Sequence, residues 1–455
     1  MIVDSIYIVS AVLFVLSLRW MGEVKTSRRG NLAGCMGMVL AVVATLLAVS
    51  LQRYDLVAIA VVAGGVLGAV MALKMPMTAV PQRTAISHAF GSIAAALVGT
   101  AEYYQHTPAI DEFTMGVIAA EVILGYLTFT GSILAFLKLQ EIISGRPFVY
   151  PGRRIISILV LCIAVLLGAY LVYLPGNITV FLCMVAFSLL FGILLVISIG
   201  GADMPTVIAI LNSFAGLSAA GLGFVLNNKL LIVAGALDGS SGLILAIMMC
   251  KAMNRSFANV LFGGFGNIAS AAVAESSGKS MKSMDPSEAS SLLAYAKSVI
   301  IVPGYGLAVA QAQHVAWELA SLLEKKGVTL SFAIHPVAGR MPGHMNVLLA
   351  EAGVPYDKLK ELDEINNEFK RTDVVIVAGA NDVVNPAAVT NKNSPIYGMP
   401  ILKAHEAKNV FVIKRGRGTG FAGIENELFT NENTHMIFGD AKQVVQQLIQ
   451  EVEKM

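Results

Sequence analysis

Two polar side chains stand inside long apolar runs of this sequence, where they could carry protons. His88 and Asn212 each lie well inside such a run. An imidazole exchanges a proton near neutral pH, and an amide can hold an imidazole or a water by hydrogen bonds. Polar groups at this depth of an apolar segment are expensive and mark functional sites. The pair therefore predicts a proton relay, with a structural hydrogen bond between helices as the alternative.

Three acids in the apolar region fit either function or local structure. Glu121 lies inside an apolar run, where it can face outer water or pair locally. Asp238 is followed by Gly239, Ser240, Ser241 and Gly242, small residues that can admit water. Asp203 stands just before a run, in Gly-Gly-Ala-Asp-Met-Pro, which favours a loop-end cap or an interface residue over a proton carrier.

A second group of residues is suited to binding phosphate. A β-branched run leads into Pro-Gly-Tyr-Gly-Leu-Ala-Val, whose Gly304 and Gly306 let a backbone approach a pyrophosphate at a helix N-terminus. The alternative for this motif is a tight turn. A later run ends in Lys414, Arg415, Gly416, Arg417, Gly418, Thr419, Gly420 and Phe421. Three cations among glycines suit a phosphate, and a solvated basic loop is the alternative.

Two further loops follow expected strands. The loop from His335 to His344 lacks the acid that binds the ribose of NAD and carries Arg340, which favours NADP or a lid over the ligand. The plain connector is the alternative. Gly379, Ala380, Asn381, Asp382 and Val383 follow another strand and suit ligand contact, or alternatively the N-cap of a short helix.

The elements that must position these loops alternate between short β-branched runs and amphipathic helices. Such alternation predicts an α/β, Rossmann-like, doubly wound parallel sheet that binds ligands at the carboxyl ends of its strands. The expected strands are Ser298–Val302, Thr329–Ile334, Asp373–Ala378, Val410–Lys414 and His435–Phe438, and the expected helices are Leu307–Lys325, Tyr356–Phe369 and Asp440–Val452.

The composition indicates a membrane region ahead of this soluble domain. The chain is 56% hydrophobic and 14% charged; residues 1–276 hold 14 Lys and Arg and 11 Asp and Glu, whereas residues 277–455 hold 18 and 19. This excludes a soluble enzyme, a disulfide scaffold and a disordered chain, and the net charge of +2 argues against nucleic acid as a partner. Nine spans of a polytopic α-helical domain are expected, at 2–18, 33–51, 55–73, 84–101, 113–137, 155–174, 177–199, 205–226 and 230–250.

The domain plan and the topology follow from these spans. We expect a transmembrane domain at 1–262, a linker at 263–290 and a cytoplasmic domain at 291–455. With the N-terminus outside, the inside segments hold 12 Lys and Arg and the outside loops hold Arg53 and Lys229. The N-terminus is interpreted as a first span and not a cleaved signal. Cys35, Cys162, Cys183 and Cys250 lack metal-ligand spacing, so no metal is expected and all four should be buried.

These motifs together resemble the β subunit of the Si-specific, proton-translocating NAD(P) transhydrogenases over nearly the whole chain. The resemblance rests on Gly-Gly-Ala-Asp-Met-Pro at 200–205, Gly-Ser-Ser-Gly at 239–242, Lys-Ala-Met-Asn-Arg-Ser at 251–256, Pro-Gly-Tyr-Gly at 303–306, His-Pro-Val-Ala-Gly-Arg at 335–340 and Gly-Ala-Asn-Asp at 379–382. It implies that this chain binds NADP(H) and conducts protons, while a partner α subunit carries NAD(H). It further implies a dimer of αβ protomers in the lipid bilayer of the bacterial cytoplasmic membrane.

The resemblance also implies roles for individual residues. His88 and Asn212 match proton-pathway positions, and Asp203, Ser240, Ser241, Gly242 and Arg255 match coupling positions. The 2′-phosphate is assigned to Lys414 and Arg415, which makes Arg340 part of a lid and not the phosphate ligand. The implied NADP contacts are Gly304, Tyr305, Gly306, Val337, Ala338, Gly339, Arg340, Met341, Pro342, Gly379, Ala380, Asn381, Asp382, Val383, Gly398, Met399, Lys414, Arg415, Gly416, Arg417, Gly418, Thr419, Gly420, Phe421, Asp440 and Ala441.

The chain departs from the family pattern at a few positions. Gly416 and Phe421 stand where relatives tend to have Ser and Tyr, and Arg417 can supply the missing phosphate contact. Asp238 stands where relatives tend to have an apolar residue. Two other functions fit the residues: a channel or secondary transporter gated by a cytoplasmic nucleotide-binding domain, and a structural membrane subunit with a vestigial Rossmann domain.

Overall fold

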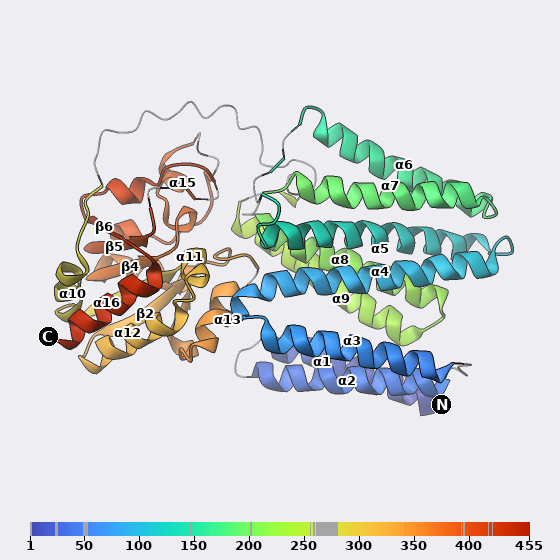
Figure 1. Ribbon diagram of the computed structural model, residues 1–455, viewed down its shortest axis with the longest axis horizontal. Coiled ribbons are helices and arrows are strands. Elements are labelled where there is room, and N and C mark those ends of the chain that lie inside the picture. Colours follow the sequence, from blue (N-terminus) through green and yellow to red (C-terminus); the bar gives the residue numbers. More distant parts are fainter. Residues whose placement is uncertain are drawn as a thin grey trace. The chain divides into compact units, whose positions relative to one another are not determined.

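A computed structural model describes most of the chain, as a helical unit followed by a sheet domain (Figure 1). The described residues are 2–22, 26–48, 53–144, 147–148, 150–200, 203–254, 256–257, 260, 281–341, 343–392, 394, 396–416, 418–420 and 422–455. Most of the linker expected at 263–290 lies outside these residues.

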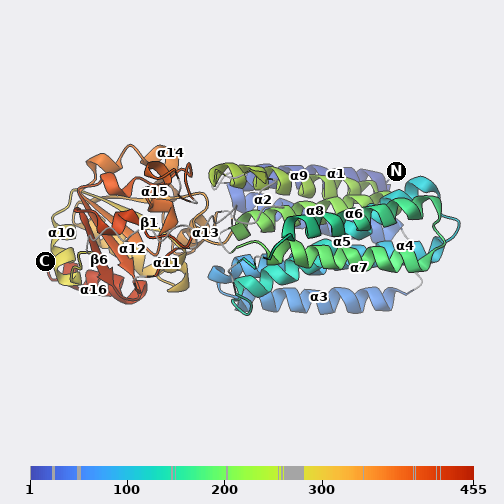
Figure 2. The ribbon, with the colours of Figure 1, turned by 90° about the horizontal axis from the view of Figure 1, so that it is seen from above.

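Among the described residues, nine helices are long and apolar enough to cross a membrane, as the sequence predicts. They run side by side within the helical unit (Figures 1 and 2). The helices are α1 (Ile2–Met21), α2 (Ser27–Ala48), α3 (Tyr54–Lys74), α4 (Val80–His106), α5 (Glu112–Leu139), α6 (Arg153–Tyr173), α7 (Ile178–Ile197), α8 (Met204–Val225) and α9 (Lys229–Ala252), and the 3-10 turn η2 (Met77–Ala79) precedes α4.

Packing within the helical unit centres on α5, which contacts α4, α6 and α7 and has the largest buried share of the nine described spans, 67%. Small residues let α8 and α9 approach closely: a Cβ on Gly216 would lie 2.6 Å from the Gly239 Cα atom. The Lys138 ammonium of α5 donates to the carbonyl oxygens of Val196 and Ile197 at 3.0 and 2.8 Å. These carbonyls end α7, so a cation satisfies the negative end of that helix.

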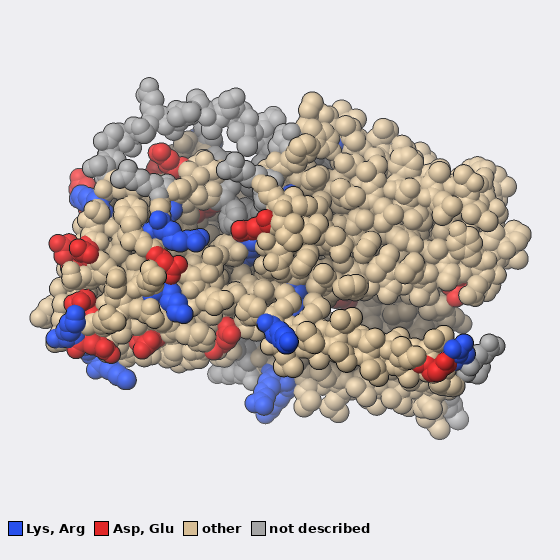
Figure 3. All heavy atoms as spheres, viewed as in Figure 1, with Lys and Arg blue, Asp and Glu red and all other residues tan. Residues whose placement is uncertain are grey.

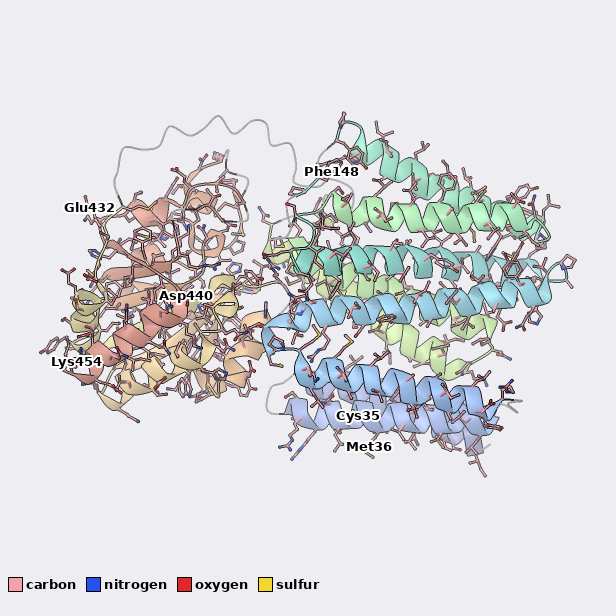
Figure 4. All side chains as sticks on the ribbon, in the orientation of Figure 1. Cys35, Met36, Phe148, Glu432, Asp440 and Lys454 are labelled. Carbon is pink, nitrogen blue, oxygen red and sulfur yellow. The ribbon has the colours of Figure 1, made fainter. Side chains whose placement is uncertain are left out.

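The outward surface of the helical unit is apolar, and this corrects one expectation. The face shown in Figure 3 carries few charged side chains over the helices, whereas Lys, Arg, Asp and Glu are scattered over the sheet domain. Cys250 is buried, but Cys35, Cys162 and Cys183 are exposed on their helices. Cys35 and its neighbour Met36 stand on α2 (Figure 4). The expectation of four buried cysteines was wrong because a membrane helix can turn apolar side chains toward lipid.

The sheet domain is built on six parallel strands in the order β3-β2-β1-β4-β5-β6. The order reverses between β1 and β4, which is the point where doubly wound sheets open a crevice for ligands. The predicted fold class is therefore confirmed. The strands are β1 (Ser298–Pro303), β2 (Thr329–Ile334), β3 (Leu359–Glu361), β4 (Val374–Ala378), β5 (Asn409–Lys414) and β6 (Thr434–Phe438).

Helices and short turns cover both faces of the sheet, as Figure 2 shows. Alternate strand residues point to opposite faces, so Ile300 and Val302 join one core cluster with Phe369 and Leu402. Most residues of the central strands are buried without a break, because both faces of the sheet are covered. The helices are α10 (Pro286–Ala294), α11 (Tyr305–Val309), α12 (Gln313–Lys325), α13 (His344–Glu351), α14 (Leu362–Ile365), α15 (Ala387–Thr390) and α16 (Ala441–Glu453), and the 3-10 turns are η5 (Tyr356–Lys358), η6 (Phe369–Arg371), η7 (Asp382–Val384), η8 (Ala404–Glu406) and η9 (Glu427–Thr430).

Two of the expected helices are wrong in detail. The helix predicted over 307–325 is broken, because α11 ends at Val309 and Gln311 has a φ of 48° before α12 begins. The helix predicted over 356–369 is instead a 3-10 turn, the edge strand β3 and the single turn α14. Residues 358–365 have the composition of a helix. Residues 359–361 instead form the strand β3, because there they pair in parallel with β2.

Residues ahead of the first strand also join the sheet domain. Ser283 forms an isolated parallel bridge with Met436 of β6. The Met436 N–H donates to the Lys282 carbonyl oxygen at 2.8 Å, and the Met284 N–H donates to the Met436 carbonyl oxygen at 3.0 Å. Helix α10 then packs on α16. Residues 282–290, ahead of the boundary expected at 291, thus contact β6 and α16.

Candidate functional site

A cavity of about 470 Å³ opens at the carboxyl ends of the strands, around the point where the strand order reverses. Its walls come from the loops that follow β1, β2, β4, β5 and β6, which the sequence predicts to bind ligand. Expected residues that line it are Gly304, Tyr305, Gly306, Val337, Ala338, Gly339, Gly379, Ala380, Asn381, Asp382, Val383, Met399, Lys414, Arg415, Gly416, Gly418, Thr419, Gly420, Asp440 and Ala441.

The glycine turns after β1 and β4 press against each other on one wall of this cavity. The Gly304 N–H donates to the Ala378 carbonyl oxygen at 2.9 Å, and the Gly306 N–H donates to that of Gly379 at 3.0 Å. A Cβ on Gly306 would lie 2.7 Å from the Gly379 Cα atom. Gly379 itself has a φ of +68°, which side chains rarely adopt. The glycines thus serve loop-to-loop contact, in addition to any approach of a ligand.

The loop after β5 brings a cation to the cavity. The Lys414 ammonium contacts the Gly418 carbonyl oxygen and lies 4.8 Å from the centroid of the Phe429 ring. Burial lowers the pKa of Lys414, and the charge of Asp382 opposes this shift. The Asp382 carboxylate also accepts from the Ala422 N–H at 3.0 Å. Asp382 therefore holds this loop against the loop after β4.

A buried histidine fixes the loop after β2. The Val337 N–H donates to His335 Nδ1 at 3.2 Å, so Nε2 carries the proton and donates to the Pro400 carbonyl oxygen at 2.7 Å. Both nitrogens are thus satisfied by a neutral ring. Burial lowers the pKa of His335 to about 4, although the bond to Pro400 opposes the shift. This histidine positions Val337 and Ala338 at the cavity and does not itself line it.

Arg340 packs against an aromatic ring beside the cavity. Its guanidinium carbon lies 4.1 Å from the centroid of the Tyr305 ring, and the backbone N–H of Arg340 donates to His344 Nδ1 at 3.0 Å. Arg340 is only 7% exposed. Burial and the charge of Arg340 lower the pKa of His344 to about 4. Arg340 is not one of the residues that line the cavity.

The amino end of α16 faces the same cavity. Asp440 is the N-cap of this helix, and its Oδ1 atom accepts from the Lys442 N–H at 3.0 Å (Figure 4). The Gly439 N–H donates to the Lys414 carbonyl oxygen at 3.0 Å, which ties the ends of β5 and β6 together. Backbone N–H groups at a helix start favour a negatively charged ligand.

The structure adds residues that sequence reasoning missed. Asn426 donates through its amide to the carbonyl oxygen and the Oδ1 atom of Asn381, at 3.0 and 2.9 Å. Asn385 is fully buried; its amide donates to the Glu425 carbonyl oxygen at 3.1 Å, and its Oδ1 accepts from the Ala387 N–H. The Asn-Pro pair at 385–386 is a turn signal that could have drawn attention to Asn385. Further cavity residues are Ala310, Ile396, Ile413, Ala422 and Gly439.

The remaining expected contacts lie beside the cavity or outside the described residues. Gly398 has a φ of +79° and donates through its N–H to the Ala388 carbonyl oxygen at 2.8 Å, next to cavity residue Met399. Met341 lies in the loop that carries Arg340. Pro342, Arg417 and Phe421 are outside the described residues, as is Arg255 of the expected coupling positions.

In the helical unit, the expected relay residues come together and a third joins them. His88 of α4 interacts with the side chain of Asn212 of α8 and with the charge of Asp238 of α9. The Asn212 amide donates to Asp238 Oδ1 at 3.2 Å. Helix α4 thus meets the consecutive helices α8 and α9 at one polar cluster, which we call the relay cluster: His88, Asn212 and Asp238.

The expected coupling residues divide into those that contact this cluster and those that do not. A Cβ on Gly242 would lie 2.9 Å from Asn212 Nδ2, so this glycine makes room for the amide. Ser240 and Ser241 instead donate to carbonyl oxygens of their own helix, to Ala236 and Leu237 and to Asp238. Asp203 is 2% exposed and lies one residue before α8.

Glu121 forms a separate buried contact. It is 1% exposed in α5, and its Oε1 atom accepts from the Ser218 hydroxyl of α8 at 3.3 Å. Its Oε2 atom has no hydrogen-bond partner among the described residues. Glu121 is therefore buried and does not face solvent, and its pairing is not local, because its partner lies 97 residues away in the chain.

Known proteins match both parts of the chain. The profile of the family described as NAD(P) transhydrogenase beta subunit matches residues 3–451. Two sequences named NAD(P) transhydrogenase subunit beta, both from Rhodospirillum rubrum, are 48% identical over 459 residues, which cover 98% of this chain and 97% of theirs. The match thus spans the nine helices, the relay cluster and the cavity. This chain belongs to the NAD(P) transhydrogenase β-subunit family.

Proposed function

We propose that this chain binds NADP(H) in the cavity of the sheet domain. The observation that carries the proposal is a cation, Lys414, at the strand ends beside the glycine turns of Gly304 and Gly379. The residues fit such a ligand, since glycine backbone suits close approach to phosphate oxygens and the α16 terminus offers N–H groups. Lys414 and Arg415 are proposed to hold the 2′-phosphate. Tyr305 with the stacked Arg340 is proposed to act as the lid.

Binding tests this proposal on the intact chain. NADPH should quench or shift fluorescence of the purified, detergent-solubilised protein at concentrations where NADH does not. Replacing Lys414 with Ala should raise the Kd for NADPH by about 10–100-fold, since a hydrogen bond to a charged group contributes ~1.5–3 kcal/mol. Lys408→Ala is the matched control, because this exposed lysine pairs with Asp373 at 2.7 Å, at the opposite ends of the strands. Equal affinity for NADH and NADPH would refute the assignment.

A β subunit implies an α subunit, and we propose that hydride passes between NAD(H) on that partner and NADP(H) on this chain. The bound nicotinamide supplies the hydride chemistry, and this chain binds it, orients it and keeps water away. The proposed assembly is a dimer of αβ protomers. It lies in a bacterial cytoplasmic membrane, with the N-terminus outside and the sheet domain in the cytoplasm, as the Lys and Arg distribution favours.

Proton movement is proposed to run through His88 and Asn212. Protonation at the relay cluster would change the occupancy of two states of the sheet domain, one open to NADP(H) exchange and one closed for hydride transfer. The test is proton uptake by proteoliposomes that contain the chain and its α partner, driven by NADPH and an NAD analogue. His88→Ala should abolish proton uptake while NADPH binding persists. Unchanged uptake in this variant would exclude the relay.

A further inference from the structure

Asp238 is an acid in the interior of a membrane-spanning helix. It stands nine residues after the first residue of α9, roughly 14 Å along the helix axis. The residue is exposed on the isolated chain, and the side chains that interact with its carboxyl are those of Asn212 and His88. A lone carboxylate in this setting is costly, and acids in spanning helices are found paired and functional.

The carboxyl of Asp238 is held by Asn212 of the neighbouring helix. The Asn212 amide donates to Asp238 Oδ1 at 3.2 Å and approaches the Asp238 carbonyl oxygen at 3.4 Å. Gly242, one turn further along α9, leaves the space in which this amide lies. The amide therefore orients the carboxyl and cannot itself take up its proton, because a neutral amide is not a base at physiological pH.

The group that faces this carboxyl from the third helix is His88. The imidazole interacts with the Asn212 side chain and with the charge of Asp238. Its Nδ1 atom is buried and has no hydrogen-bond partner among the described residues. Within the described chain, His88 is the titratable group that interacts with Asp238; Glu121 of α5 is bonded to Ser218 of α8 instead.

We infer that Asp238 is the proton-exchanging partner of His88, with Asn212 as the positioning residue between them. This inference rests on the proposed proton translocation. In one state an imidazolium faces the Asp238 carboxylate. In the other state the imidazolium N–H bond has broken, the proton has formed an O–H bond on the carboxyl, and both groups are neutral. The pair has zero net charge in both states, which keeps the cost of either state low in an apolar surrounding.

Substitution of the acid tests this step in proteoliposomes with the α partner. Asp238→Asn keeps the shape and a carbonyl oxygen for Asn212 but cannot take a proton. It should lower proton translocation at least about 100-fold, in the range of general acid–base contributions. Asp238→Glu keeps a titratable carboxyl and should restore translocation with an altered pH profile. Asp55→Asn is the matched control, because this exposed acid of α3 pairs with Arg53 at 2.7 Å, and it should leave the rate unchanged.

The outcomes separate the two claims. Translocation by Asp238→Asn at the wild-type rate and with the wild-type pH profile would overturn the role of Asp238 alone. No translocation by the wild type would remove the proposed function and this inference with it. NADPH binding reveals whether Asp238→Asn has reconstituted. Where it has not, Asp238→Glu decides: translocation by Asp238→Glu as low as that by His88→Ala would overturn the inference. In the His88→Ala background, Asp238→Asn should change the residual rate by less than about twofold, because coupled residues are not additive.

Discussion

The helical unit and the sheet domain place their polar residues by different means. In the sheet domain, the cavity is built from loops at strand ends, so strand direction and strand order bring Gly304, Gly379 and Lys414 together. In the helical unit, the relay cluster depends on which faces of α4, α8 and α9 meet. Topology therefore fixes the first site, whereas helix rotation and close approach fix the second. Four predictions test this contrast.

The largest effect is expected where two turns press together in the sheet domain. Gly379→Ala places a Cβ against the backbone of Gly306 and Leu307 at a φ of +68°. Strain and clash together should cost about 2–5 kcal/mol of unfolding free energy and weaken NADPH binding. The control is Gly327→Ala, at a φ of +89° with no atom within 4 Å of the new Cβ, which should cost only about 1–2 kcal/mol. Equal losses in both variants would contradict the tight contact.

Denaturation can be followed separately in the two regions. The two tryptophans are Trp20 in α1 and Trp317 in α12. In a Trp20→Phe background, fluorescence of Trp317 reports unfolding of the sheet domain. Loss of NADPH binding without loss of stability in Gly379→Ala would show that this glycine serves the ligand more than the fold.

The second prediction concerns acid. The folded pKa of His335 is about 4, below its ordinary value of 6.5, so the unfolded chain takes up the proton first as the pH falls. The contribution of this histidine to stability is therefore full above about pH 7, and roughly 2–3 kcal/mol of unfolding free energy should be lost between about pH 7 and about pH 4.5. His335→Gln should be less stable at neutral pH but lose less on acidification. Parallel pH profiles for the two proteins would contradict this.

The third prediction breaks the contact between two membrane helices. Gly216→Val places side-chain atoms against the backbone of Gly239, so α8 and α9 must separate. The cost should be about 1–3 kcal/mol, and proton translocation should fall because Asn212 and Asp238 move apart. NADPH binding should persist. Gly64→Val on α3, where no atom lies within 4 Å, is the control. Equal translocation by the two variants would show that close approach is not needed.

The smallest effect is expected from removing a helix N-cap, and the loss of stability should be the same in both regions. Asp440 caps α16 and Asp111 caps α5, each by accepting from a backbone N–H at 3.0 Å. Replacing either with Ala should lower stability by ~1 kcal/mol, measured by thermal denaturation with the probe suited to each region. A much larger loss of stability in Asp440→Ala would show that this residue holds more than its own helix.

Sequence patterns were sufficient for most of the fold and for the enzyme class. The nine spans, the parallel sheet and the family were predicted from apolar runs, β-branched runs and long motifs, and all are confirmed. The edge strand β3 was missed because three residues of helix-forming composition carry no strand signal. The break at Gln311 was missed because Ala-Gln-Ala favours a continuous helix.

The two candidate sites also differed in how much of each could be predicted from the sequence. The loops of the cavity could be predicted, because turn-forming residues directly after a strand indicate both where a loop lies and which backbone conformation it adopts. The support from Asn426 could not, since it lies 45 residues from Asn381 in the chain. Contact between Asn212 and Asp238 was likewise not predicted, because their separation of 26 residues says nothing about which helix faces meet.

Residues 282–284 join the sheet domain beside β6. There, the backbone of Met436 forms one hydrogen bond with the Lys282 carbonyl oxygen and one with the Met284 N–H. Three and four residues later, Gly439 and Asp440 form part of the cavity wall. A displacement of residues 282–284 would therefore reach β6 directly and the rim of the cavity three residues further along the chain. The segment that begins the described sheet domain is thus bonded to the strand that leads into the cavity wall.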